Sequence, residues 1–115
     1  MHETSITVPK SLSVLINKWR HQINVSKVCI NALQKELDRL AEITVDRRTK
    51  PKRRPRQKER YVNVRIEYAQ ELAERIAPYK PYLNISAVCS EAIETYIVTL
   101  ESLPEDVQRV MLQEE

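Results

Sequence analysis

Two short segments of the chain alternate polar and apolar residues, which is the pattern of a β-strand with one buried face. They are residues 5–8, Ser-Ile-Thr-Val, and residues 61–66, Tyr-Val-Asn-Val-Arg-Ile. After each segment the apolar residues recur at the spacing of an amphipathic helix. Pro9 precedes the first of these helices, whereas the second should begin near Tyr68 and stop at Pro78. The pattern therefore predicts a strand and a short helix in each half.

A longer amphipathic helix is predicted next in each half, and its first turns are repeated in the sequence. Residues 24–32 read NVSKVCINA and residues 84–92 read NISAVCSEA, so that five of nine positions are identical. Each repeat begins with an asparagine, Asn24 or Asn84, which is a favourable helix N-cap. A further helix should start near Glu105, where a proline is followed by two acidic residues. The chain thus contains the unit strand-helix-helix twice, followed by one short helix.

The 115 residues are enough for one compact domain but not for two independent ones. One strand and two short helices cannot bury their own apolar faces, and a single strand cannot satisfy its backbone hydrogen bonds. We therefore expect a mainly α-helical fold in which the strands form a short antiparallel ribbon and the helices interlock over one shared core. The predicted units are a first repeat over 1–41, a basic linker or arm over 42–59, a second repeat over 60–101 and a C-terminal helix or tail over 102–115.

The basic residues are concentrated between the two halves, although the net charge is only +3. Residues 47–60 contain nine lysines and arginines and one glutamate, and Pro51 and Pro55 argue against a helix here. A basic block between two mildly acidic halves favours a polyanionic partner such as nucleic acid or an anionic membrane surface, with a merely solvated linker as the alternative. Phosphate contacts from this arm are expected at Arg53, Arg54, Arg56 and Lys58.

Several classes of function lack support in the sequence. No arrangement of serine, histidine and acid indicates catalysis, no glycine-rich loop could hold a nucleotide phosphate, and neither histidine is spaced from a cysteine as a metal ligand would be. We therefore expect no enzyme, cofactor, metal or small-molecule substrate. Cys29 and Cys89 should be small buried side chains, not a disulfide or a metal site. The lack of a signal sequence and of a long apolar segment predicts a cytoplasmic protein.

The order of strand, helix and capped helix with an Asn-x-Ser start resembles the ribbon-helix-helix superfamily of Arc/MetJ-type DNA-binding proteins, here in tandem. The resemblance covers residues 3–40 and 59–101. It implies that the two copies form an intramolecular pseudo-dimer whose antiparallel ribbon enters the major groove of double-stranded DNA. Family members commonly have a glycine in the turn between the helices, and this chain has none. His21 or Gln22 would then take the left-handed backbone conformation, and the second turn would use two extra residues.

Alternation along the strands places Ser5 and Thr7 on the face away from the helices, together with Tyr61, Asn63 and Arg65. The resemblance implies that these five residues read DNA bases. Arginine can bond guanine and asparagine can bond adenine, whereas serine and threonine discriminate less. For Ser5 and Thr7 an ordinary exposed strand edge is the alternative. When the strands are aligned on their buried positions, Ser5 pairs with Asn63 and Thr7 with Arg65, which predicts an asymmetric DNA site.

The starts of the two capped helices are candidate phosphate-binding sites, because a helix N-terminus presents backbone amides and a partial positive charge. The alternative is N-capping without a ligand. Because one such helix start is expected on each side of the ribbon, the pair favours contacts to phosphates on both sides of a DNA groove. The residues concerned are Asn24, Val25 and Ser26 in the first half and Asn84, Ile85 and Ser86 in the second.

The favoured function is a sequence-specific DNA-binding protein, a transcriptional repressor that binds cooperatively as several adjacent units and is associated with the nucleoid. A second hypothesis is a DNA-binding adaptor for plasmid partition or a relaxosome, or an antitoxin. Its protein partner would bind the C-terminal segment through Leu103, Val107, Val110 and Met111, and the alternative for this segment is a helix packed on the core. A third hypothesis is an RNA-binding or membrane-surface protein that uses the basic arm alone.

Overall fold

The computed structural model describes residues 2–44, 47 and 60–113. Over these residues the elements are β1 (His2–Pro9), α1 (Lys10–Trp19), α2 (Val25–Glu42), β2 (Tyr61–Tyr68), α3 (Gln70–Ile76), the 3-10 turn η2 (Ala77–Tyr82), α4 (Ile85–Ser102) and α5 (Glu105–Gln113). The described part of the chain is thus mainly α-helical with one two-stranded sheet, as the sequence predicts. None of the helices within it is long and apolar enough to span a membrane.

The two strands pair antiparallel, with Ser5 opposite Arg65 and Thr7 opposite Asn63. The predicted partners, Ser5 with Asn63 and Thr7 with Arg65, are therefore wrong. An antiparallel ladder reverses the order of residues along one strand, so an alignment of both strands in the same direction does not give cross-strand neighbours. Both strands are also longer than the predicted segments.

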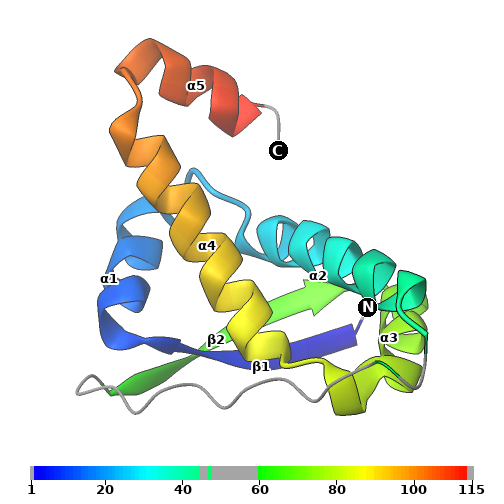
Figure 1. The fold of residues 1–115 in the computed structure, drawn as a ribbon. Coiled ribbons are helices and arrows are strands. Elements are labelled where there is room, and N and C mark those ends of the chain that lie inside the picture. The colour runs from blue at the N-terminus through cyan, green and yellow to red at the C-terminus, as the bar shows by residue number, and fades with distance from the viewer. Residues whose placement is uncertain (1, 45–46, 48–59, 114–115) are drawn as a thin grey trace.

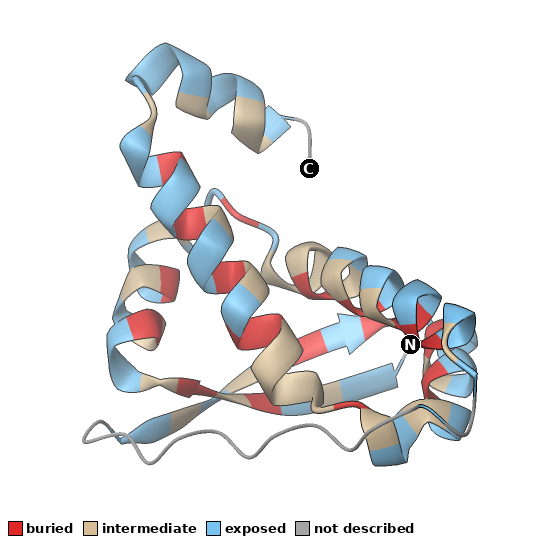
Figure 2. Cartoon of the chain, in the orientation of Figure 1, coloured by how far each residue is buried: buried red, intermediate tan, exposed pale blue. Residues whose placement is uncertain are grey.

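The helices of both halves lie on one side of the ribbon (Figure 1). Ile6 and Val8 of β1 and Ile66 and Tyr68 of β2 are buried, whereas Arg65 and Glu67, on either side of Ile66, are exposed. Figure 2 colours the two strands by burial. Because successive side chains of a strand point to opposite faces, the ribbon has one face toward the core and one face away from it. We call the second of these the outer face.

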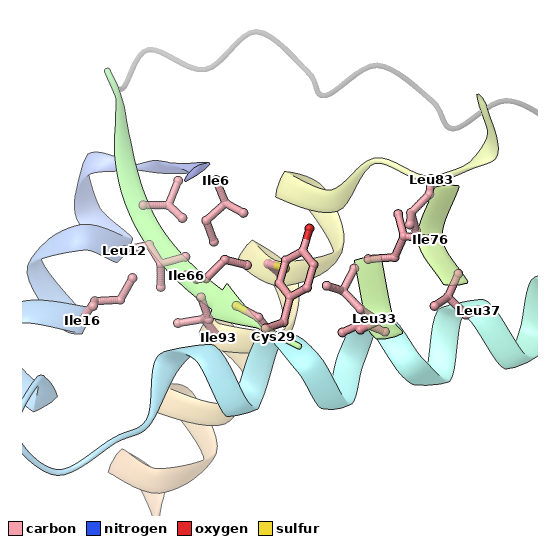
Figure 3. Close-up of a cluster of buried hydrophobic side chains, with 14 of the residues drawn as sticks. Ile6, Leu12, Ile16, Cys29, Leu33, Leu37, Ile66, Ile76, Leu83 and Ile93 are labelled. Carbon is pink, nitrogen blue, oxygen red and sulfur yellow. The ribbon is translucent and has the colours of Figure 1, made fainter. Parts of the chain in front are cut away.

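The hydrophobic core repeats itself at a spacing of sixty residues. Each of the nine buried apolar residues within 2–44 has a buried apolar counterpart sixty positions later. Residues of both halves pack into one cluster, to which Ile6, Cys29, Leu33, Ile66 and Ile93 belong (Figure 3), so the halves share a core. The pairs are Ile6 and Ile66, Val8 and Tyr68, Leu12 and Leu72, Ile16 and Ile76, Ile23 and Leu83, Cys29 and Cys89, Leu33 and Ile93, Leu37 and Ile97, and Leu40 and Leu100.

The two cysteines lie in this core as buried free thiols. A hydrogen bond with Cys29, together with burial, raises the pKa of the Cys89 thiol. Both side chains are fully buried, which confirms the prediction of small core residues. A neutral thiol in such surroundings packs as a small apolar group, so the cysteines contribute to the contact between α2 and α4.

The turns between the paired helices form without a left-handed residue, since no described residue has a positive φ. Arg20 ends α1 in the right-handed helical region, with φ −56° and ψ −27°. The prediction that His21 or Gln22 adopts the left-handed conformation is therefore wrong. The second turn is η2, and it adds no residues, because the sixty-residue spacing of the core continues on both sides of it. The short helix before it begins at Gln70, later than predicted, because Tyr68 still belongs to β2.

The C-terminal helix α5 is tied to the end of α4. The side-chain amide of Gln108 donates hydrogen bonds to the carbonyl oxygens of Leu100 (2.9 Å) and Leu103 (3.1 Å). The Leu100 carbonyl also accepts from the amide of Leu103, the residue that follows α4, so Gln108 adds hydrogen bonds at a helix end where the last carbonyls lack intrahelical partners. Leu112 also packs against the core. The short helix predicted near Glu105 is therefore confirmed.

Candidate nucleic-acid interface

The outer face of the ribbon gathers the residues that the sequence predicts to read DNA. Ser5, Asn63 and Arg65 are exposed, and Thr7 is half-buried. Tyr61, which is 36% exposed, lies at the end of the ribbon opposite Pro9. The side chains come from both strands, so that the antiparallel pairing places residues far apart in the sequence on one narrow surface.

Two glutamates that were not among the predicted base-reading residues share the outer face. Glu3 and Glu67 lie opposite each other, next to the pair formed by Ser5 and Arg65. The Arg65 guanidinium donates to the Glu3 carboxylate and forms an ion pair with it. The hydrogen bond and the charge of Arg65 lower the pKa of Glu3, and Glu3 raises the pKa of Arg65 in the same way. Strand alternation places Glu3 on the same face as Ser5 and Thr7, and its continuation to residue 67 would have placed Glu67 there as well.

The pKa of Glu3 tests this ion pair in solution. We expect a pKa below the ordinary value of a glutamate, and we expect Arg65→Ala to raise it. Because the pKa is lowered in the folded state, the pair stabilises the fold above the ordinary pKa, and this contribution is lost as the pH falls through the folded-state value. The side-chain carboxyl shift of Glu3, followed by NMR during an acid titration, measures both effects. An unchanged pKa in Arg65→Ala would show that the two side chains do not pair.

The starts of α2 and α4 carry the predicted N-caps. The side-chain oxygen of Asn24 accepts a hydrogen bond from the amide of Lys27 (3.1 Å), and that of Asn84 accepts one from the amide of Ala87 (3.0 Å). Capping and phosphate binding are compatible. The cap uses only one amide of the first turn, and the other first amides have no acceptor within the helix. Those first amides belong to Val25 and Ser26 in α2 and to Ile85 and Ser86 in α4.

A serine at each of these helix starts holds the strand of the other half of the chain. The Ser86 hydroxyl accepts a hydrogen bond from the amide of Thr7 (3.0 Å), and the Ser26 hydroxyl accepts one from the amide of Glu67 (3.1 Å). The buried Ser90 donates a further hydrogen bond to the carbonyl of Thr7 (3.1 Å). The start of α4 is thus fixed beside β1, and the start of α2 beside β2. Ser26 and Ser86 were predicted to bind phosphate, and their hydrogen bonds to the strands were not foreseen from the sequence.

Arg60, the last residue of the basic segment 47–60, lies at the end of the ribbon. The carbonyl of Arg60 accepts a hydrogen bond from the amide of Lys10 (2.9 Å), and both side chains are exposed. Two positive charges therefore lie near the end of the ribbon where β2 begins. The predicted phosphate contacts at Arg53, Arg54, Arg56 and Lys58 lie outside the described residues.

A second candidate surface involves the helices, not the strands. A groove of about 770 Å³ lies between α2 and α4, and its apolar lining includes Val28, Ala32, Val88 and Ala92. Met111 of α5 also lines this groove.

The four residues predicted to bind a protein partner differ in their exposure. Val107 and Val110 are 42% and 54% exposed, whereas Leu103 and Met111 are half-buried. The exposed apolar part of α5 therefore consists of the two valines.

No family model matches this chain, and neither does any curated protein or solved structure. Among the described residues no group of three or more histidine, cysteine or acidic side chains could hold a metal ion. A functional assignment must therefore come from the geometry of the outer face and of the helix starts beside it.

Proposed function

We propose that this protein is a sequence-specific double-stranded DNA-binding protein that inserts its two-stranded ribbon into the major groove. The observation that carries the proposal is the polar outer face, with Ser5, Asn63 and Arg65 exposed on a ribbon whose other face packs on the core. The major groove admits a two-stranded ribbon, in which arginine can bond guanine bidentately and asparagine can bond adenine. Thr7 and Tyr61 complete the proposed base-reading set.

We also propose that the chain is a tandem ribbon-helix-helix protein, in which one chain supplies both halves of a pseudo-dimer. The sixty-residue spacing of the buried residues supports this arrangement. So do the reciprocal hydrogen bonds of Ser26 and Ser86, and the register, which places Ser5 directly opposite Arg65, its counterpart sixty positions later. An approximate twofold axis through this central pair accounts for all three relations. Because serine faces arginine across the axis, the proposed DNA site is asymmetric.

The starts of α2 and α4 would bind phosphates on the two sides of the occupied groove. Their first amides lie beside the ribbon, held there by the serine hydrogen bonds, and a helix N-terminus favours an anion. The arm residues around Arg53 would neutralise further phosphates. Several such proteins bound side by side would occlude a stretch of duplex, so we assign the protein as a transcriptional repressor that binds cooperatively.

Selection from a pool of random duplexes tests the proposal. The full-length protein should enrich one defined, non-palindromic sequence and protect it from nuclease. The logarithm of its affinity should fall with the logarithm of salt concentration by about 0.9 for each phosphate contact. Enrichment of no sequence would contradict sequence-specific binding. Preferential retention of RNA, or of anionic vesicles, would instead favour a protein that uses the basic arm alone.

A second candidate function is a DNA-binding adaptor or antitoxin, and the exposure of Val107 and Val110 on α5 favours it. Two neighbouring valines on an exposed helix could bind a protein partner while the ribbon holds DNA. In this case the proteins encoded by neighbouring genes, such as a toxin or a filament-forming ATPase, are the partners to test.

The double variant Val107→Ser/Val110→Ser separates the two candidate functions. We expect unchanged DNA affinity in either case, because α5 is not part of the ribbon. The adaptor function further predicts loss of co-purification with the candidate partner. The matched control is Val14→Ser, since Val14 on α1 is 58% exposed. Unchanged co-purification in the double variant would contradict the adaptor function. Deletion of α5 would be a poorer test, because Leu112 packs on the core and its loss could disturb the fold.

A further inference from the structure

The outer face of the ribbon is divided into three cross-strand rows of different charge. The acidic row is Glu3 opposite Glu67, the arginine row is Ser5 opposite Arg65, and the amide row is Thr7 opposite Asn63. Adjacent rows are two residues apart along a strand, which is about 7 Å, or about two base-pair steps of B-DNA. Adjacent rows would therefore face different base pairs when the ribbon lies along the groove.

The acidic row makes the outer face unfavourable for a binding mode that uses only contacts to DNA phosphates. The three rows carry one positive charge, Arg65, and two negative charges, Glu3 and Glu67, so their sum is −1. Like charges directly opposite each other also destabilise a two-stranded ribbon. The ion pair of Arg65 with Glu3 offsets this repulsion. Since a surface that binds the DNA backbone through charge would be positive, the two carboxylates require another explanation.

The floor of the major groove offers partners for these carboxylates. Its hydrogen-bond donors are the amino groups of cytosine N4 and adenine N6, and an acidic side chain accepts from cytosine N4. Arg65 can donate to O6 and N7 of guanine. Binding at a matching site would exchange the ion pair of Glu3 and Arg65 for these two contacts. Where the groove presents a carbonyl oxygen instead, the carboxylate would be desolvated without a donor, which is a penalty specific to the wrong sequence.

We infer that Glu3 and Glu67 are specificity-determining residues of the ribbon, which select cytosine about two base-pair steps from the guanine read by Arg65 and weaken binding to other sequences. This inference rests on the proposed function of the ribbon in DNA binding. In the free protein the Arg65 guanidinium is paired with the Glu3 carboxylate. DNA that lacks the matching bases must break this pair without replacing it, so the glutamates increase the ratio of specific to nonspecific affinity.

Binding-site selection with the variants Glu3→Gln and Glu67→Gln tests the inference. Glutamine bonds N6 and N7 of adenine, so each variant should change the selected base from cytosine toward adenine at one position, with about a tenfold change in discrimination. Affinity for unrelated duplex should rise because a negative charge is lost. The control Glu94→Gln removes the same charge from an exposed position on α4 and should change neither quantity.

The outcomes distinguish this inference from the proposed function. If both ribbon variants select the wild-type sequence with unchanged discrimination, the glutamates do not read bases and the inference alone is wrong. If the wild-type chain enriches no sequence, the proposed function fails as well. Glu3 and Glu67 are exposed, so the variants should keep the wild-type circular dichroism spectrum. The measured effects then report the lost carboxylates and not a damaged fold.

Discussion

Replacing Arg65 by alanine should weaken binding to the selected duplex by about 10- to 100-fold, since a bidentate arginine–guanine contact discriminates by about 1–3 kcal/mol. The variant should no longer distinguish this duplex from one in which the guanine is changed. Its outer-face rows would also hold two negative charges and no positive one, which adds repulsion from DNA. Arg65 is exposed and outside the core, so the fold should be unaffected.

Two further variants separate base reading by Arg65 from a general effect of charge. Arg109→Ala removes the same charge from α5, where Arg109 makes a long ion pair of 3.9 Å with Glu105, and it should leave affinity nearly unchanged. Arg65→Lys keeps the charge without the planar fork, so it should restore nonspecific affinity but not guanine selection. Fluorescence anisotropy at fixed salt measures all three variants. An equal loss for Arg65→Ala and Arg109→Ala would contradict base reading by the ribbon.

Ile97→Ala should lower the free energy of unfolding by about 2–5 kcal/mol, because it leaves a cavity in a tightly packed region. Ile97 on α4 is fully buried, and it belongs to the cluster that contains residues of both halves. We therefore expect the whole chain to lose stability in a single transition. Unfolding in urea, followed by far-ultraviolet circular dichroism and by fluorescence of Trp19, the only tryptophan, measures this effect.

The position of Trp19 makes the experiment a test of the shared core. Trp19 belongs to α1 in the other half, where it packs against the cluster and donates a hydrogen bond to Glu101 (3.1 Å). Both probes should shift to the same lower urea concentration. A fluorescence transition that stays at the wild-type midpoint would show that the halves unfold separately. The control Val98→Ala, at a neighbouring position that is 57% exposed, should cost about 0.5 kcal/mol or less.

Much of the fold could be predicted from periodicity, because burial along a helix or strand follows its local geometry. The alternating segments lie within β1 and β2, and the asparagine caps mark the starts of α2 and α4. The turns could not be predicted in the same way. The left-handed residue expected after α1 is absent from the described chain, because right-handed helical residues and a 3-10 segment make these turns instead.

The candidate site was only partly predictable. Strand alternation placed Ser5, Asn63 and Arg65 on an exposed face, and the structure agrees. The acidic partner of Arg65 was missed, because an ion pair between residues 3 and 65 depends on the register of two distant strands. The serine anchors were missed for the same kind of reason, since a serine in a first helical turn gives no indication of which strand amide it will contact.

Periodicity and repeated motifs were enough to predict most of the elements, the sixty-residue repeat and the polar face of the ribbon, because these patterns are visible in the residue order alone. Tyr68 is an exception, since it was expected to begin a helix and is instead buried in β2. Three relations became known only from the folded chain: Ser5 faces Arg65, Glu3 pairs with Arg65, and Ser26 and Ser86 bind the strands of the opposite halves. These relations depend on the pairing register, which alternation does not specify, because side chains of a strand return to the same face every two residues. A shift of pairing by two residues keeps the same side chains buried but changes every cross-strand neighbour, so alternation alone cannot choose the register. Packing of the helices over both strands at once makes that choice.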